Sequence, residues 1–142
     1  MPDTILVPID GSPLAERALR YAVENFPTAS FTAMFVINPV DSIFVAETSG
    51  LPTANEWYEK AQRRAAAIHE DATEIAGEYD VEITTVTEIG RPAREILDYA
   101  DENGIDQIVM GSHGRDGLER AILGSVAETV IRSGQQPVTI IR

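Results

Sequence analysis

The feature that most constrains the fold of this chain is the alternation of short apolar runs with longer amphipathic segments. The apolar runs are continuous, as expected for strands that are covered on both faces of a sheet. The predicted strands are 4–9, 30–37, 81–88, 106–110 and 137–141, and the predicted helices are 13–26, 55–79, 92–102 and 118–132. This order predicts an α/β fold, with a mainly parallel five-stranded sheet, helices on both faces and right-handed crossovers.

The first helix has clear boundaries in the sequence. Ser12 can cap its amino end, Pro13 suits its first position, and Pro27 stops it. Its expected apolar stripe is Leu14, Ala18, Ala22 and Phe26. The pair 103–104, Asn-Gly, is typical of the end of a helix and closes the segment that precedes the fourth strand.

The length and composition indicate one folded unit. The 142 residues, of which 44% are hydrophobic, predict a single domain over 1–142 with one sizeable core. There is no cysteine, which excludes disulfides, thiolate metal sites and cysteine nucleophiles. The apolar run at 5–9 is too short for a signal peptide, and no run approaches the ~18 residues of a membrane span, so we expect a cytoplasmic protein. The longest irregular segment, 38–52, has a length typical of functional loops.

The charge is strongly negative, with 23 Asp and Glu against 11 Lys and Arg and a net charge of −12. This argues against binding nucleic acid or an anionic membrane, because both require a basic surface. Only Lys60 is a lysine; the other basic residues are arginines. An acidic, lysine-poor surface is typical of proteins that work in molar salt, where the Debye length is about 3 Å and self-repulsion is screened. We therefore expect a halophilic source, and an ordinary acidic cytosolic protein is the alternative.

Two predicted strands end in segments that combine glycine with polar or charged residues, 8–12 and 109–115. In the second, two residues separate Gly111 from Gly114, and nine residues separate Gly114 from Gly124. Glycines at a strand end expose backbone N–H groups, which can bind phosphate. Gly124 interrupts a helical pattern at a cost of about 1 kcal/mol relative to alanine. Either a helix begins or bends there and directs its amides at the same phosphates, or these glycines only serve turns and helix packing.

The spacing Gly111-x2-Gly114-x9-Gly124-Ser125 resembles the ATP-binding signature of the universal stress protein family. The resemblance extends over nearly the whole chain, through segments 5–12, 109–115, 123–128 and 137–141. It implies a Rossmann-like sheet of order 3-2-1-4-5 and membership of the nucleotide-binding branch, here with the surface of a haloarchaeal protein. It also implies a homodimer, paired through the edge strand Val138–Ile141.

The resemblance implies an ATP site made by Pro8, Ile9, Asp10, Val36, Met110, Gly111, Gly114, Arg115, Gly124, Ser125 and Val126. In it, Asp10 accepts from a ribose hydroxyl or lies near Mg²⁺ or Mn²⁺, and the backbone of Val36 meets the adenine edge. The glycine segments bind the phosphates through N–H groups, and Arg115 adds a bidentate donor. Purely structural roles are the alternative at three positions: Asp10 or Ser12 can cap the first helix, and Arg115 can pair with a surface carboxylate.

Motifs for efficient phosphoryl transfer are missing. The chain has no GxxxxGK[ST], GxGxxG or HExxH, and its histidines, His69 and His113, are far apart in the sequence. The leading hypothesis is therefore a regulatory stress-response module whose state depends on bound ATP. The alternatives are a slow adenine-nucleotide hydrolase or transferase on the same fold, and a structural dimer that binds no nucleotide. The sequence does not identify the stress, the pathway or a protein partner.

Overall fold

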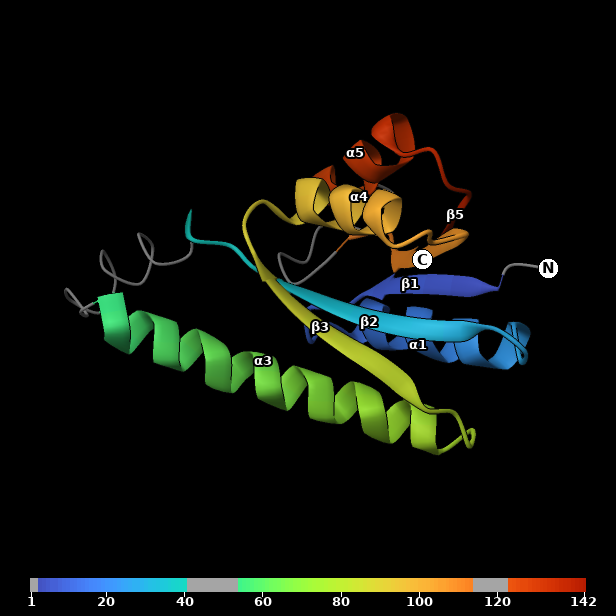
Figure 1. The fold of residues 1–142 in the computed structure, drawn as a ribbon, viewed down its shortest axis with the longest axis horizontal. Coiled ribbons are helices and arrows are strands. Elements are labelled where there is room, and N and C mark those ends of the chain that lie inside the picture. The colour runs from blue at the N-terminus through green and yellow to red at the C-terminus, as the bar shows by residue number, and fades with distance from the viewer. Residues whose placement is uncertain (1–2, 41–53, 114–122) are drawn as a thin grey trace.

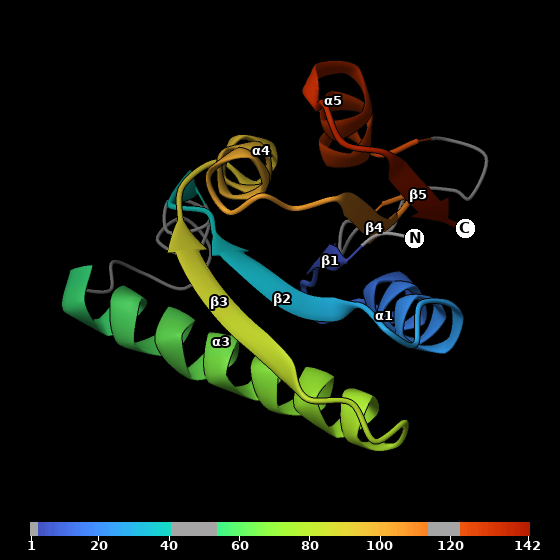
Figure 2. The same cartoon turned by 45° about the vertical axis from the view of Figure 1, so that its right-hand side comes forward.

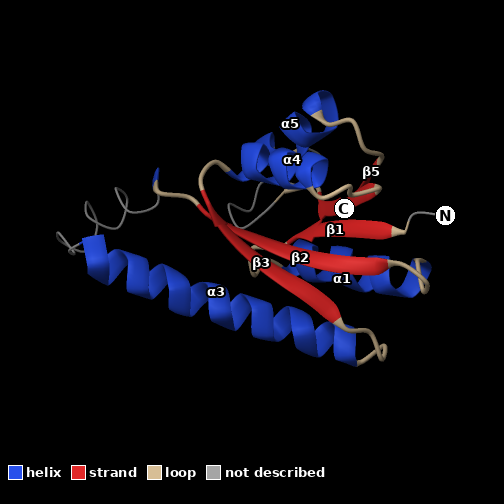
Figure 3. Cartoon of the chain, in the orientation of Figure 1, coloured by secondary structure: helices blue, strands red, loops and turns tan. Residues whose placement is uncertain are grey.

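The computed structural model describes residues 3–40, 54–113 and 123–142. In chain order, its elements are β1 (Thr4–Pro8), α1 (Pro13–Asn25), β2 (Ser30–Ile37), α3 (Ala54–Gly77), β3 (Ile83–Ile89), α4 (Pro92–Glu102), β4 (Gln107–Gly111), α5 (Ser125–Ser133) and β5 (Val138–Ile141). The strands form one parallel sheet of order β3-β2-β1-β4-β5. Figures 1 and 3 show this sheet among the helices, and the strands can be followed in this order in Figure 2. This confirms the predicted fold class and strand order.

Helices cover both faces of the sheet. α1 and α3 pack on one face, and α4 and α5 on the other (Figure 2). The central strand β1 serves both layers: Ile5 and Val7 pack in the α1–α3 core, and Leu6 packs in the α4–α5 core. All three side chains are fully buried, which explains the continuous apolar run in this part of the sequence.

The amino end of α1 follows the sequence signals. Gly11 has a φ of +82°, a left-handed conformation that suits glycine, and the Ser12 hydroxyl accepts from the N–H of Ala15 at 3.3 Å. The buried stripe of the helix is shifted from the expected one. It consists of Ala15, Ala18, Leu19, Ala22 and Val23, whereas Leu14 and Phe26 are half-buried. Leu14 lies instead close to Gly111 at the end of β4, where a Cβ on the glycine would be 2.9 Å from the Leu14 Cβ.

The segment after α3 also differs from the prediction, since the helix ends at Gly77 and β3 begins at Ile83. Asp80 has a φ of 58°, and the N–H of Val81 donates to the Ala76 carbonyl at 3.0 Å. That hydrogen bond closes the helix end over the turn at 78–80, and residues 81 and 82 lie in the connection to β3 rather than in the expected strand.

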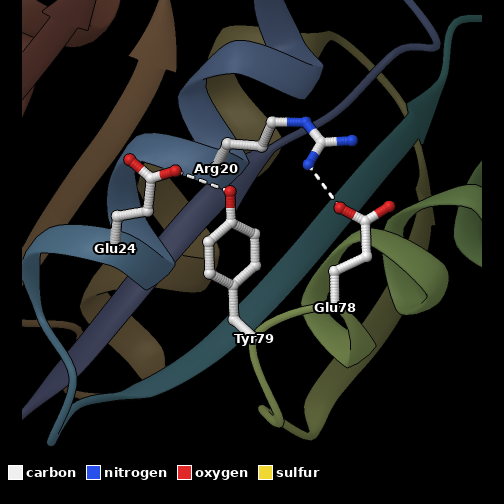
Figure 4. Close-up of polar contacts among 4 residues, drawn as sticks. All are labelled: Arg20, Glu24, Glu78 and Tyr79. Carbon is white, nitrogen blue, oxygen red and sulfur yellow. Dashed lines mark hydrogen bonds and ion pairs between the residues drawn. The ribbon is translucent and has the colours of Figure 1, made fainter.

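Two polar contacts hold this turn against α1, as Figure 4 shows. Arg20 forms an ion pair with Glu78 at 2.6 Å, and the Tyr79 hydroxyl donates to Glu24 at 2.6 Å. The Glu78 carboxylate is mainly responsible for raising the pKa of Arg20, and Arg20 lowers the pKa of Glu78. These contacts fix the carboxyl end of α3 beside α1.

The carboxyl end of β1 is paired with β2 but not with β4. β1 pairs with β2 along its whole length, up to Pro8 opposite Met34. Its register with β4 covers only two pairs, the last being Leu6 opposite Ile108. No ladder pairs therefore join the carboxyl ends of β1 and β4, at the point where the chain switches from one half of the sheet to the other. In open α/β sheets, ligands bind at this point.

Two further expectations concern the loop at 38–52 and membrane-spanning helices. The loop predicted at 38–52 lies outside the described residues except for its first three positions. Within the described part of the chain, no helix combines the length and the apolar composition needed to cross a membrane.

Candidate functional site

A cavity of about 460 Å³ lies at the carboxyl edge of the sheet. Its wall is built by the ends of β1, β2 and β4 and by the first turns of α1, α4 and α5. The lining residues are Pro8, Ile9, Asp10, Ser12, Ala15, Met34, Phe35, Val36, Asn38, Arg91, Pro92, Ala93, Ile96, Met110, Gly111, His113, Gly124, Ser125, Val126, Ala127 and Thr129. The volume lies in the range of small-molecule sites, and the wall is largely apolar with a few polar groups.

Nine of the eleven residues expected in the site line this one cavity, although they come from distant parts of the sequence. They are Pro8, Ile9, Asp10, Val36, Met110, Gly111, Gly124, Ser125 and Val126. The remaining two, Gly114 and Arg115, lie outside the described residues. The fold thus gathers the predicted residues in one place, and their contacts with a ligand stay a prediction.

Asp10 and Ser12 have different local roles at the amino end of α1. Ser12 caps the helix, whereas the Asp10 carboxylate accepts from the N–H of Ser12 at 2.9 Å. Asp10 is thereby held in a tight turn, with its side chain on the cavity wall. It orients the turn and is not itself the cap.

The first turn of α5 presents backbone donors to the cavity. Gly124 is the N-cap, and no side chain among the described residues caps this helix end. Residues 125–127 line the cavity, and the first intrahelical bond runs from the N–H of Glu128 to the Gly124 carbonyl at 2.9 Å. The preceding amides of the turn have no partner within the helix and carry its positive dipole end, a combination that favours an anion.

The structure decides between the two interpretations of the segment that contains Gly124. Residues 123 and 124 are not helical, so a continuous helix over 118–132 is wrong, and a helix that begins next to Gly124 is correct. The Gly124 N–H donates to the Ser112 carbonyl at 2.7 Å, which joins the two ends of the intervening segment. This contact spans twelve positions, so the helical pattern of the sequence does not reveal it.

Close packing explains the two described glycines of the motif without any ligand. A Cβ on Gly124 would lie 2.9 Å from the Ser112 carbonyl oxygen and 2.9 Å from the Cβ of His113. A Cβ on Gly111 would lie 2.9 Å from the Cβ of Leu14, at the start of α1. The packing interpretation of these glycines therefore holds in the structure, and the site owes its shape to these close approaches.

Sequence reasoning missed three polar residues on the wall: Asn38, Arg91 and Thr129. Arg91 is exposed, precedes the first turn of α4, and is the one Arg or Lys side chain on the cavity wall within the described ranges. Its segment, 90–92, appears in the sequence as an ordinary turn. Only the position of α4 beside the end of β2 brings Arg91 to the site.

The histidines do not form a catalytic or metal-binding cluster in the described part of the chain. The His113 Nδ1 lies 3.1 Å from the Ser112 hydroxyl, on the cavity wall. His69 lies on α3, with its Nε2 2.8 Å from the Thr87 hydroxyl, and burial lowers its pKa. Among the residues that the structure describes, no group of three or more His, Cys, Asp or Glu side chains is arranged to hold a metal ion.

Comparison with known proteins links this geometry to a family. The model of the universal stress protein family matches residues 1–142. Universal stress protein MJ0531 of Methanocaldococcus jannaschii is 34% identical over 141 residues, which cover 97% of this chain and 81% of the relative.

Solved structures share the fold. The structure of MJ0577, a universal stress protein of the same organism, superposes with a TM-score of 0.81 at 29% identity and covers 98% of this chain and 94% of its own. The universal stress protein of Archaeoglobus fulgidus in complex with dAMP has a TM-score of 0.69 at 25% identity and covers 99% of this chain and 98% of its own.

Proposed function

Because this chain belongs to the universal stress protein family, we propose that it binds ATP in the cavity at the carboxyl edge of its sheet. Nucleotide occupancy then acts as a state signal in a stress response. The observation that carries the proposal is that strand ends and the open helix start of α5 bring nine expected residues to one cavity of about 460 Å³. The complex of the Archaeoglobus fulgidus relative with dAMP supports an adenine nucleotide as the ligand class.

The proposed pose follows from the polarity of the wall. The phosphates lie over Gly111 and the first turn of α5, where amides without a partner in the helix and a positive dipole end favour an anion. The adenine lies toward the end of β2, where Met34 and Val36 contribute apolar surface. Asp10 lies on the wall between the phosphate end and the adenine end of the cavity, next to the proposed position of the ribose. In this pose the net charge of −12 does not exclude ATP, because local dipoles bind the phosphates.

Mg²⁺ or Mn²⁺ would enter with the phosphates. Asp10 is the carboxylate on the described wall, and one of its oxygens already accepts from Ser12. A single carboxylate is typical of magnesium–nucleotide sites, in which phosphate oxygens and water supply the other ligands. The ion would reduce the repulsion between the phosphates and the acidic surface.

Mass spectrometry of small molecules released from gently purified protein tests the proposal, together with calorimetry of ATP binding in high salt. We expect an adenine nucleotide to be recovered and ATP to bind. Recovery of no nucleotide and absence of binding would favour a structural dimer instead. Release of labelled phosphate faster than about 0.1 per second, against about 10 per second for a typical enzyme, would favour the hydrolase alternative.

We also propose a homodimer that pairs through β5. This strand is the edge of the sheet and has β4 on one side only. The Pro137 carbonyl accepts from Ile108, and the Ile141 carbonyl accepts from Ser112, so the odd-numbered positions bond to β4. The N–H of Ile140 therefore faces the free edge, where it can pair with a second copy.

Replacement of Ile140 by proline tests this interface. The substitution removes a donor at the free edge and leaves the hydrogen bonds to β4 in place, so we expect a monomer by light scattering. Ile140→Val is the matched control and should stay dimeric. Proline at Thr139 is a poorer test, because the alternation of the ladder directs that N–H to β4. An unchanged mass for Ile140→Pro would refute the proposed interface.

The acidic composition supports adaptation to high salt as a further part of the proposal. With 23 acidic and 11 basic residues, self-repulsion opposes folding at low ionic strength. We expect the free energy of unfolding to rise as KCl increases from about 0.1 M to 1 M, over which the Debye length falls from about 10 Å to 3 Å. A free energy that stays constant or falls over this range would contradict the adaptation.

A further inference from the structure

We propose that Arg91 stacks its guanidinium on the outer face of the bound base and thereby positions the nucleoside. The inference rests on the proposed function, since it names a further residue of the same site. It assigns a role to a side chain for which the sequence motif provides none.

The position of Arg91 in the fold points to the base rather than to the phosphates. The N–H of Gly90 donates to the Ile37 carbonyl at 2.9 Å, which fixes this turn beside the carboxyl end of β2. The proposed phosphate site, Gly111 and the first turn of α5, follows β4. β1 lies between β2 and β4 in the sheet, so Arg91 is at the opposite end of the cavity from the phosphates.

The backbone around Arg91 is held on both sides. Arg91 has an extended conformation, with φ −84° and ψ 124°, and Pro92 follows it as the first residue of α4. The Arg91 carbonyl accepts from the N–H of Glu95 at 2.9 Å, as the first hydrogen bond of the helix. The side chain therefore starts from a fixed point on the rim, and ordering its guanidinium is the main entropic cost of a contact.

The Arg91 side chain forms no ion pair with any carboxylate in the described parts of the chain. Arg94, one turn further along the same helix, lies 3.8 Å from Asp98 and does not line the cavity. Arg91 is an exposed residue, so a ligand that recruits its guanidinium breaks no existing ion pair in these regions.

Near the end of β2, the described part of the wall offers no exposed aromatic side chain for stacking, because the His113 imidazole belongs to the other end, beside Gly124. Near the end of β2 the cavity is lined by aliphatic and thioether side chains, among them Met34, Val36 and Ile96. Phe35 is the one Phe, Tyr or Trp residue on the described wall, and it is 4% exposed and packed in the core beneath α1 and α3. A flat base can thus place one face on the apolar wall, and Arg91 can cover the other as a planar cation.

Calorimetry with adenosine, AMP and ATP tests the assignment on the full chain. A stacking contact with the base is shared by all three ligands, so Arg91→Ala should lower the binding affinity for each of them by a similar factor of about 5-fold. Arg91→Lys keeps the charge without the plane and should not restore affinity. Arg91→Tyr keeps a plane without the charge and should restore most of it. Arg94→Ala is the matched control and should bind as the wild type does.

Each contrary outcome overturns the assignment. If the loss of affinity in Arg91→Ala increases from adenosine to AMP to ATP, and Arg91→Lys restores the affinity, then Arg91 contacts the phosphates instead of the base. Unchanged affinities in Arg91→Ala would remove it from the site, while the proposed function would stand because the wild type still binds. If the wild type binds none of the three ligands, the proposed function fails and this inference fails with it.

Discussion

The contact between Gly124 and the segment that follows β4 allows a sharp test of how the site is built. The backbone of Gly124, with φ −66° and ψ 155°, is one that any residue adopts, so alanine brings no torsional strain. Its Cβ would however lie 2.9 Å from the Ser112 carbonyl oxygen, 2.9 Å from the His113 Cβ and 3.0 Å from the His113 Cα. Favourable contacts between carbon atoms are at about 3.5–4.0 Å, so the two segments must separate by roughly 0.5–1 Å.

That separation weakens the 2.7 Å hydrogen bond from the Gly124 N–H to Ser112. Overpacking of this kind costs about 1–3 kcal/mol, so we expect Gly124→Ala to lower the free energy of unfolding by that amount in urea titrations. For a chain of this size the loss corresponds to a fall in Tm of about 3–12 °C. We expect ATP binding to weaken as well, because the start of α5 moves with Gly124.

Gly77 provides the matched control. An added Cβ at Gly77 meets nothing within 4 Å, and this residue ends α3. Gly77→Ala should therefore stabilise the protein by about 0.4–1 kcal/mol, since alanine reduces the entropy of the unfolded chain. A Gly124→Ala protein as stable as the wild type would refute the packing argument, because it would mean that the two segments tolerate the separation freely.

One imidazole and one carboxylate give predictions about acid stability. Burial lowers the pKa of His69 below its usual value near 6.5, so at mildly acidic pH the unfolded chain binds a proton that the folded chain does not. The free energy of unfolding should therefore fall as the pH is lowered from about 7 to 5. In urea titrations at a series of pH values, His69→Gln should flatten this part of the profile of free energy against pH. Asp106→Asn should lower the Tm at pH 7, because this carboxylate accepts from the N–H groups of Asp3 and Thr4 at 2.9 and 3.1 Å. These hydrogen bonds lower the pKa of Asp106 below its usual 3.8, so the stabilisation is present above pH 3.8 and is lost as the pH falls through the lower pKa of the folded state. An Asp106→Asn protein with an unchanged Tm at pH 7 would contradict this account.

The sheet was predictable because its strands are buried on both faces. Segment 30–37 coincides with β2, which is buried and apolar throughout 33–37, where odd positions pack in one core and even positions in the other. β3 was less predictable. It is an edge strand with exposed Thr84 and Thr85, and its start at Ile83 depends on how the end of α3 is closed. That closure is a hydrogen bond from the Val81 N–H to the Ala76 carbonyl, a local backbone contact that the alternation of residues does not encode.

The site was predictable where the strand ends define it and not where the helices do. Asp10 and Met110 follow directly from the rule that ligands bind at the carboxyl ends of parallel strands. Arg91 and Thr129 reach the same wall only because α4 and α5 pack on one face of the sheet with their first turns at this edge. The direction of a helix over a sheet follows from crossover geometry, but the residue of its first turn that faces the cavity depends on packing angles that the sequence does not specify.

The glycine spacing that identifies the family has therefore two physical causes, and only one of them concerns the ligand. Gly111 and Gly124 are required because Leu14 and the backbone at 112–113 approach them too closely for any side chain. Those approaches place the start of α5 where amides without a partner in the helix face the cavity, so in the proposed site the motif acts on the nucleotide through the position of a helix. A bulkier residue at either glycine would weaken binding even if neither glycine touches a nucleotide. Contacts must therefore be tested at residues such as Arg91, whose exposed side chain can be changed without moving the wall.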